Sequence, residues 1–428
     1  MSDIIKNNIL TSTYLITWIL TLIWYQRKNS KIDGGTAAIF FYIVYAVFSI
    51  LTINDPLFSL MFNPLQVFPY IYLYSMLMLA LAPVIYNHIH PTKIITPPNS
   101  RILTILAIFI IVNAILLIPS ILSDGVSGMF QLFTDETAGK EAYSEMLSHA
   151  DETGKTISNI PSIFFNATSL IAIFLLFYFL TTNKKNKWLI CGLAFCVCLN
   201  VFIPVTHGMR GGTIEALLVI IGAYALFSAY MDKRIVKRIR NMGIIFFCAI
   251  SLPILAITVS RFGESAGGAG GAVNWYVGQG SLYFNNYALN AGGTRNGERV
   301  LNYFKRLTNN DVPHNYVERR DKYHNLELDD NYFSTFVGDF CIDFGPVCAV
   351  FIFVFFAIVA TRAIRTQRKE IKLHQILLLY FTLCVSLQGG MTLFTFSDAG
   401  NLQLIVFATL YIYLRYHEKL LEVFPLKE

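Results

Sequence analysis

Charge is what this sequence lacks most. Of its 428 residues only 14% are charged, against roughly 25% in soluble domains, whereas 55% are hydrophobic. The hydrophobic residues gather in runs long enough to cross a bilayer, which takes about 20 residues. The composition therefore excludes an ordinary soluble protein and predicts an all-α polytopic membrane protein.

Motifs of several enzyme classes are also missing. The chain has no Walker motif, no Gly-x-Ser-x-Gly elbow and no His-x-x-x-His pair. No ionisable side chain falls at the middle of a predicted span, where ion-coupled transporters usually carry such groups. All seven cysteines lie in predicted spans, so we expect neither a disulfide framework nor a zinc site. We expect no metal and no nucleotide cofactor.

The hydrophobic runs predict eleven transmembrane helices. Their ranges are 6–25, 36–53, 66–86, 102–122, 160–181, 188–206, 212–230, 242–260, 335–360, 375–393 and 400–415. We find no internal repeat and no separable soluble enzyme, so residues 1–428 are predicted to form one integral membrane domain. Its two long loops, 123–159 and 261–334, fall on the same side of the membrane.

Lysine and arginine predict the orientation, because they accumulate in cytoplasmic loops. Of the 33 lysines and arginines, 21 lie in one alternating set of loops and in the carboxyl-terminal tail. We therefore expect the amino terminus and both long loops to be periplasmic and the carboxyl terminus cytoplasmic. The net charge of +6 follows from this topology and gives no reason to invoke nucleic acid.

An arginine wrapped in glycines is the most distinctive motif. Arg210 lies in the stretch Val-Thr-His-Gly-Met-Arg-Gly-Gly-Thr at 205–213, between two apolar runs. Glycine lets the backbone approach a ligand closely, and a guanidinium group suits a phosphate or pyrophosphate. The motif favours an anion site at the outer membrane boundary, with an interfacial anchor as the alternative.

Further arginines lie in the loop 261–334, where positive charge opposes the topological bias and needs a local reason. Arg261 ends a predicted span, and Arg295 and Arg299 are four residues apart, on one face if that segment is helical. We predict that these three, with Arg210, bind a pyrophosphate. The alternative for the four-residue pair is a solvated face paired with Glu298.

Acidic and imidazole groups provide candidates for proton transfer. Asp339 and Asp343 are four residues apart at the outer end of a predicted span, so they either pair with arginines or accept a proton from a sugar hydroxyl. His324 is a candidate base, since imidazole titrates near neutrality. His207 and Glu215 flank the glycine-wrapped arginine and are candidate supporting residues, Glu215 as an ion-pair partner.

The large loop is also rich in aromatic and amide side chains, as in Asn-Trp-Tyr at 274–276 and Tyr-Phe-Asn-Asn-Tyr at 283–287. Aromatic faces and amides together suit sugar rings, which present apolar faces and hydroxyl edges. The alternative is a packed cap over the outer surface. The sequence leaves both open.

These features together resemble the bacterial oligosaccharide repeat-unit polymerases of Wzy type that assemble O-antigen and capsule. The resemblance is carried by the many spans, the large outside loop, the His-Gly-Met-Arg-Gly-Gly turn at 207–212 and the Gly-Asp-Phe…Asp-Phe-Gly-Pro stretch at 338–346. The segment 283–307 resembles the EpsG-like branch.

The resemblance implies a function. A glycan on undecaprenyl pyrophosphate would be transferred to the non-reducing end of another lipid-linked repeat unit, on the periplasmic face of the inner membrane and without metal or cofactor. It implies a fold similar to the GT-C glycosyltransferases and pyrophosphate contacts from Arg210 and one or more of Arg261, Arg295 and Arg299. Donor and acceptor lipids, membrane lipid and a chain-length regulator would be the partners.

Two other functions stay open. An O-antigen ligase, which resembles the polymerases and carries a histidine in its large loop, would use a lipid A core as acceptor. A flippase would move the lipid-linked unit without breaking a bond, and it should carry charged residues in a central cavity.

Overall fold

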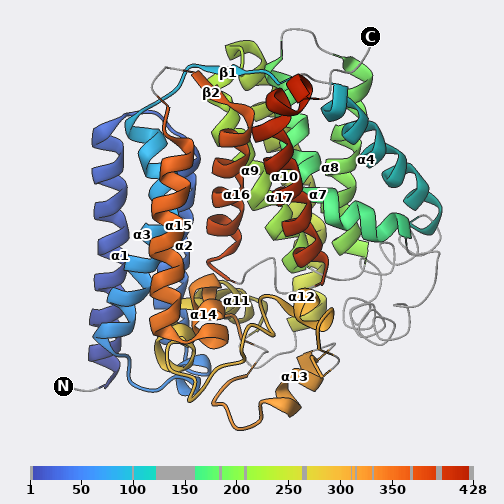
Figure 1. Ribbon diagram of the computed structural model, residues 1–428. Helices are drawn as coiled ribbons and strands as arrows, with labels where there is room; N and C mark the ends of the chain where they lie inside the picture. The colour runs from blue at the N-terminus through green and yellow to red at the C-terminus, as the bar shows by residue number, and fades with distance from the viewer. Residues whose placement is uncertain are drawn as a thin grey trace. The chain divides into compact units, whose positions relative to one another are not determined.

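The computed structural model describes most of the chain as helices. The described residues are 3–98, 101–121, 160–182, 186–206, 210–262, 268–309, 311–313, 316–329, 332–366, 370–391 and 398–423. The chain divides into two compact units, one made of residues 1–100 and 277–428 and the other of residues 101–276 (Figure 1). The predicted loop 123–159 lies outside the described residues.

The first unit is built from both ends of the chain. Its amino-terminal elements are α1 (Asp3–Lys28), α2 (Gly34–Ile53), η1 (Phe58–Met61), α3 (Val67–Ile89) and β1 (Ile94–Thr96). Its carboxyl-terminal elements are η6 (Phe284–Ala288), α12 (Asn302–Arg306), α13 (Tyr316–Lys322), α14 (Thr335–Phe344), α15 (Pro346–Ile364), β2 (Glu370–Lys372), α16 (Leu373–Gln388) and α17 (Asp398–Val423).

The second unit is a bundle with α7 as its most buried helix. Its elements are α4 (Arg101–Ser120), α7 (Ile160–Thr181), α8 (Lys187–Thr206), α9 (Arg210–Phe227), η5 (Ser228–Tyr230) and α10 (Lys233–Phe262). Helix α11 (Gly268–Tyr283) begins in this unit and ends in the first. Apolar residues of α8, α9 and α10 form one core cluster that includes Val201, Leu217 and Ile257.

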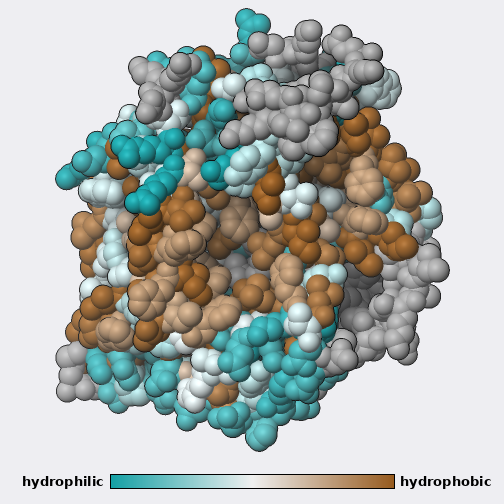
Figure 2. Space-filling model, in the orientation of Figure 1, coloured by the Kyte–Doolittle hydropathy of each residue, from teal (hydrophilic) through white to brown (hydrophobic). Residues whose placement is uncertain are grey.

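Nine helices in the described part of the chain are long and apolar enough to cross a membrane: α1, α2, α3, α4, α7, α8, α9 with η5, α10 and α15. The prediction of an all-α polytopic membrane protein is confirmed at this level. Hydrophobic side chains gather over the middle of α1 and α15 in Figure 2, with hydrophilic side chains toward their ends. This distribution suits helices surrounded by lipid.

The prediction of one continuous transmembrane helix over residues 335–360 is wrong. The structure breaks it into α14 and α15 at Gly345, whose φ of 79° lies in the left-handed region that glycine adopts easily. Pro346 then occupies the first turn of α15, where its missing N–H leaves no bond unmade. With 10 residues, α14 is too short to cross the membrane. It is a separate short helix that carries Asp339 and Asp343.

In the first unit, loops that were predicted to lie on the same side of the membrane lie at the same end of the helices. Strands β1 and β2 pair in parallel, which joins the basic segments after α3 and α15 at one end. At the other end, Asn286 bonds the backbone of Asn63 through both amide atoms, at 3.0 and 3.4 Å. Loops predicted to share a side therefore lie at the same end of this unit.

Aromatic rings fill the core between the amino-terminal helices. Trp18 of α1 is fully buried and stacks on Tyr42 of α2, with ring centroids 4.6 Å apart. The hydroxyl of Tyr42 donates to the carbonyl of Ser386 in α16, at 2.7 Å. Gly278 of α11 lets this helix approach α2, because a Cβ there would lie 2.3 Å from the carbonyl oxygen of Phe48.

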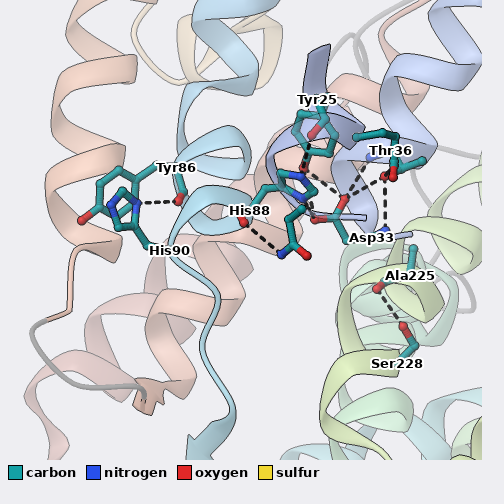
Figure 3. A network of polar contacts seen from close by, with 10 residues as sticks. Tyr25, Asp33, Thr36, Tyr86, His88, His90, Ala225 and Ser228 are labelled. Carbon is teal, nitrogen blue, oxygen red and sulfur yellow. Dashed lines mark hydrogen bonds and ion pairs between the residues drawn. The ribbon is translucent and has the colours of Figure 1, made fainter. Parts of the chain in front are cut away.

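A histidine–carboxylate network joins the ends of α1, α2 and α3 (Figure 3). Asp33 caps α2 by accepting from the amide of Thr36 at 3.0 Å, and it lies 2.6 Å from Nδ1 of His88. Nε2 of His88 lies 2.9 Å from the carbonyl oxygen of Tyr25. Both ring nitrogens face acceptors, so His88 donates both bonds only in its protonated form.

We expect His88→Ala to lower the free energy of unfolding by about 2 kcal/mol, because it removes the partner of a carboxylate that is only 26% exposed. His90 provides the matched control two residues later. It is exposed and bonds only its own helix, so His90→Ala should change stability by less than about 0.5 kcal/mol. Unfolding of the two purified variants in detergent micelles measures the difference, and equal effects would contradict the prediction.

Candidate functional site

The loop 295–300 of the first unit is wrapped around the last turn of α14. The amide of Arg295 donates to the carbonyl of Ile342 at 3.0 Å, and the amide of Gly297 to the carbonyl of Asp343 at 3.2 Å. Gly297 has a φ of 80°, which favours glycine at this bend. The loop therefore satisfies the carbonyls that a helix end leaves without partners.

Asp343 fixes the same loop through its side chain. Its carboxylate accepts from the amide of Arg299 at 3.1 Å and from the amide of Val300 at 2.5 Å. The side chain is fully buried, and burial raises the pKa of Asp343 to about 7, although the Val300 amide and the Arg299 guanidinium favour the ionised form. Asp343 thus positions the backbone that carries the predicted arginines.

Asp339, one turn earlier in α14, forms a buried ion pair with Arg299. The guanidinium nitrogen lies 3.0 Å from Oδ1 of Asp339, and the two side chains are 4% and 0% exposed. The hydroxyl of Ser334 donates to the same carboxylate oxygen at 3.0 Å. Of the two alternatives that the sequence left for this carboxylate, the structure contains the arginine pair. A catalytic role for Asp339 and Asp343 stays a prediction.

Arg295 is almost fully buried, at 1% exposure, beside a tyrosine. Its guanidinium carbon lies 5.7 Å from the centre of the Tyr323 ring, and the Tyr323 hydroxyl donates to the Arg295 carbonyl at 3.3 Å. Burial raises the pKa of Tyr323, so this hydroxyl stays a donor. Glu298, the predicted partner of the arginine pair, instead bonds Lys322 at 3.1 Å.

His324 follows this tyrosine and is exposed. Its Nδ1 lies 2.9 Å from the carbonyl oxygen of Asp321, which can only accept, so Nδ1 carries the proton. In the neutral ring, Nε2 is then the basic nitrogen. This tautomer is the one that a base acting through Nε2 requires.

A cavity of about 340 Å³ lies among α3, α14, α15, α16 and α17. Its walls are apolar and aromatic, and Figure 2 shows the face hollowed and hydrophobic at this level. The phenylalanines that line it are Phe336, Phe340, Phe344, Phe353, Phe356 and Phe381. An aromatic cavity of this size among membrane-length helices suits an apolar chain.

The cavity and the buried charges share two segments of the chain. On α14, Phe336, Phe340 and Phe344 recur every four residues and line the cavity, whereas Asp339 lies on the adjacent flank of the helix. Val300, directly after Arg299, also lines the cavity. One short helix therefore has an apolar face toward the cavity and a charged face toward the loop.

Arg210 belongs to the second unit, where it is the first residue of α9 rather than a loop residue. It is 4% exposed, its guanidinium donates to the hydroxyl of Thr258 at 3.3 Å, and it lies 4.4 Å from the centre of the Tyr276 ring. Gly211 makes room for that ring, because a Cβ there would lie 2.5 Å from the Tyr276 hydroxyl oxygen. The guanidinium group of Arg210 thus contacts both a hydroxyl group and an aromatic face.

The remaining predicted residues are less informative. Glu215 is half-buried in the second turn of α9. Arg261 lies in the last turn of α10, and the structure describes its backbone only; His207 lies outside the described residues. Arg295, Arg299, Asp339 and Asp343 are thus gathered in the first unit, and Arg210 is found in the second, so each group stands within its own unit.

The amide and aromatic motif of 283–287 serves the fold. The side-chain amide of Asn285 accepts a hydrogen bond from the backbone amide of Gln66 at 2.9 Å and donates one to the backbone carbonyl of Gln66 at 2.8 Å. A neighbouring β-strand would bond this backbone in the same way. The hydroxyl of Tyr283 accepts from the amide of Asp329 at 2.6 Å. These contacts favour the packed cap over a sugar-binding surface for these residues.

Sequence reasoning missed several members of both groups. Nothing in the sequence pointed to Thr258 or Ser334, because their partners lie far along the chain or across a turn. The four-residue recurrence of phenylalanine in α14 was a readable signal for an apolar helix face. No family model, no curated protein and no solved structure matches this chain. The fold and composition therefore establish a multi-pass membrane protein and leave its activity to be proposed.

Proposed function

We propose that this protein is a metal-independent membrane glycosyltransferase that polymerises lipid-linked oligosaccharide repeat units. The observation that carries the proposal is the shared use of α14 and residues 299–300 by the aromatic cavity and by the buried charges. A ligand that meets both parts has an apolar chain and an anionic head. A polyprenyl pyrophosphate has this composition.

The donor would be a glycan on undecaprenyl pyrophosphate. Arg295 and Arg299 lie on a loop whose backbone is fixed by five amide and carboxylate contacts to α14, so their charges are held in place before a ligand arrives. Preorganised donors stabilise a developing oxyanion by about 3–4 kcal/mol each at comparable sites. The pyrophosphate roles predicted for Arg210 and Arg261 stay predictions.

The proposed reaction is one displacement. The acceptor hydroxyl oxygen, at the non-reducing end of a second lipid-linked repeat unit, forms a bond to the anomeric carbon of the donor glycan. The bond from that carbon to the pyrophosphate oxygen breaks, and undecaprenyl pyrophosphate leaves with the electron pair. The hydroxyl proton passes to Nε2 of His324, whose tautomer leaves that nitrogen basic. Asp339 acts by positioning Arg299, and Asp343 by fixing the loop backbone.

The proposal includes a topology and a location. Adding α16 and α17 to the nine membrane-length helices makes eleven crossings, in an arrangement similar to GT-C enzymes. An odd number of crossings places the two termini on opposite sides. With the basic loops in the cytoplasm of a bacterium, the amino terminus and the site of the first unit lie on the periplasmic face of the inner membrane.

A chain-growth assay tests the function. Purified full-length protein in proteoliposomes is supplied with lipid-linked repeat units extracted from a strain that lacks its gene, and products are separated by size. A polymerase gives a ladder. A single product on added lipid A core would indicate a ligase instead, and transfer across the bilayer with no new bond would indicate a flippase.

If Arg210 stabilises the leaving pyrophosphate as the sequence predicts, Arg210→Ala should slow chain growth in this assay by about 100-fold, because it removes a buried guanidinium group. Arg320→Ala is the control, since Arg320 is exposed on α13 and lies in the same large loop. Its ladder should match the wild type. A full-length ladder from a folded Arg210→Ala variant would contradict the pyrophosphate role predicted for Arg210.

A further inference from the structure

The first two turns of α10 carry an unusual density of positive charge. Five of the eight residues from 233 to 240 are basic and all five are exposed: Lys233, Arg234, Lys237, Arg238 and Arg240. No acidic residue lies in these turns.

Nothing within the described part of the chain balances this charge. None of the five side chains has an ion pair or a hydrogen bond there, whereas Arg299 and Lys322 of the first unit pair with carboxylates. Asp232 directly precedes the helix, and its backbone carbonyl accepts from the amide of Ile235 at 2.9 Å. Among the described residues, the charge of these turns is therefore not neutralised by any side-chain contact.

Their position makes the charge costly. The amino-terminal end of a helix carries a partial positive charge, so cations there are unfavourable. Lys233 and Lys237, and Arg234 and Arg238, are also four residues apart, and like charges at that spacing repel each other. An anion from outside the chain would relieve both effects.

The charge is confined to one side of the helix. At 3.6 residues per turn, Lys233, Lys237 and Arg240 form one stripe, with Arg234 and Arg238 beside it. The apolar residues of these turns, Ile235, Val236 and Ile239, lie on the opposite side and are half-buried. A helix divided in this way is suited to the boundary between headgroups and acyl chains.

The length of α10 sets the depth of these turns. Its 30 residues span roughly 45 Å, about 15 Å more than the hydrocarbon core of a bilayer. The apolar portion after residue 241 fills the core, and the eight residues before it extend the helix by about 12 Å. Their side chains then lie among the headgroups of the leaflet.

We infer that the basic face of α10, defined as Lys233, Arg234, Lys237, Arg238 and Arg240, is a docking surface for anionic phospholipid headgroups. The phosphates of the leaflet supply the negative charge that the described residues do not provide there. Each basic residue near such a surface contributes a factor of about five in affinity, equivalent to ~1 kcal/mol. The inference does not depend on the proposed enzymatic function.

The test compares binding of two lipids to the full-length protein in detergent. Native mass spectrometry follows the protein as phosphatidylglycerol or phosphatidylcholine is added. We expect the wild type to bind phosphatidylglycerol more tightly, and we expect Lys233→Gln/Lys237→Gln/Arg240→Gln to weaken its first binding step by at least about fivefold. High salt should weaken binding to the wild type in the same way.

Two matched controls separate this surface from basic charge in general. The triple variant Arg362→Gln/Arg365→Gln/Lys372→Gln removes three exposed basic residues at the same predicted membrane side and should retain wild-type binding. Lys233→Arg/Lys237→Arg keeps the charge and should also bind normally. Should the α10 triple variant fail to fold, Lys237→Gln alone and the salt titration of the wild type carry the test.

Three outcomes would overturn the inference. The first is a wild type that binds phosphatidylglycerol no better than phosphatidylcholine, which would leave an acidic protein as the partner class. The second is a folded α10 triple variant with unchanged binding. The third is an equal loss in the Arg362, Arg365 and Lys372 variant.

Discussion

Arg299→Ala is expected to lower the free energy of unfolding by about 3–5 kcal/mol, because it leaves a buried carboxylate without its counter-charge. Asp339 is fully buried, and besides Arg299 it receives the hydroxyl of Ser334. The hydroxyl of Ser334 is a neutral donor and does not replace an ion pair at this depth. Denaturant titration in micelles, followed by the loss of helical circular dichroism, measures the change.

The matched control is Lys322→Ala. Lys322 pairs with two carboxylates, those of Glu298 at 3.1 Å and Asp311 at 3.0 Å, but its own side chain is 27% exposed and that of Asp311 is 83% exposed. Water can replace much of that interaction, so the expected cost is at most about 1 kcal/mol. A loss for Arg299→Ala no larger than that of Lys322→Ala would show that the buried pair contributes little.

A double replacement separates stability from function at the same pair. Arg299→Met/Asp339→Leu removes both charges and keeps apolar volume, so it should recover most of the stability that Arg299→Ala loses. If Arg299 contacts the donor pyrophosphate, this folded double variant still fails to extend chains. A double variant that is stable and fully active would restrict the pair to a structural role and remove Arg299 from the proposed site.

The sequence predicted the helices that composition alone determines. Long apolar runs with basic flanks sufficed for α1 to α10, because each helix must satisfy its own backbone bonds in lipid. The break between α14 and α15 was also readable, since Pro346 interrupts the apolar run directly after Gly345. It was missed because residues 335–360 are apolar throughout, and hydropathy alone does not show where the chain changes direction between two helices.

The site was predictable only in part. The four-residue spacing of Asp339 and Asp343 correctly indicated two carboxylates near the loop arginines, but spacing could not say that one binds a guanidinium and the other two backbone amides. The partners of Arg210, Thr258 and Tyr276, lie roughly 50 and 65 residues away in sequence and are brought in by helix packing. Contacts of this kind depend on tertiary structure, which the pattern of a single sequence does not contain.

The aromatic cavity was invisible in the sequence for the same reason, since its walls come from five helices and one loop. Its importance is nevertheless easy to test. Ser386 of α16 lines the cavity, is 1% exposed, and its hydroxyl makes no hydrogen bond within the described residues. Replacing this side chain therefore changes the cavity without breaking a side-chain hydrogen bond among the described residues.

Ser386→Phe should weaken binding of the lipid-linked donor about 1,000-fold, because the new ring fills the space that the proposed prenyl chain occupies. Loss of one isoprene unit from an apolar site costs roughly 4 kcal/mol, at ~0.8 kcal/mol for each buried methylene-sized group. Ser386→Ala is the control: it leaves the cavity open and should bind as the wild type does. Direct binding of a fluorescent polyprenyl pyrophosphate to both folded variants measures the difference. Equal affinities would exclude this cavity as the chain site, whereas lost binding with an intact Arg299–Asp339 pair would show that the apolar chain and the charged groups contribute separately.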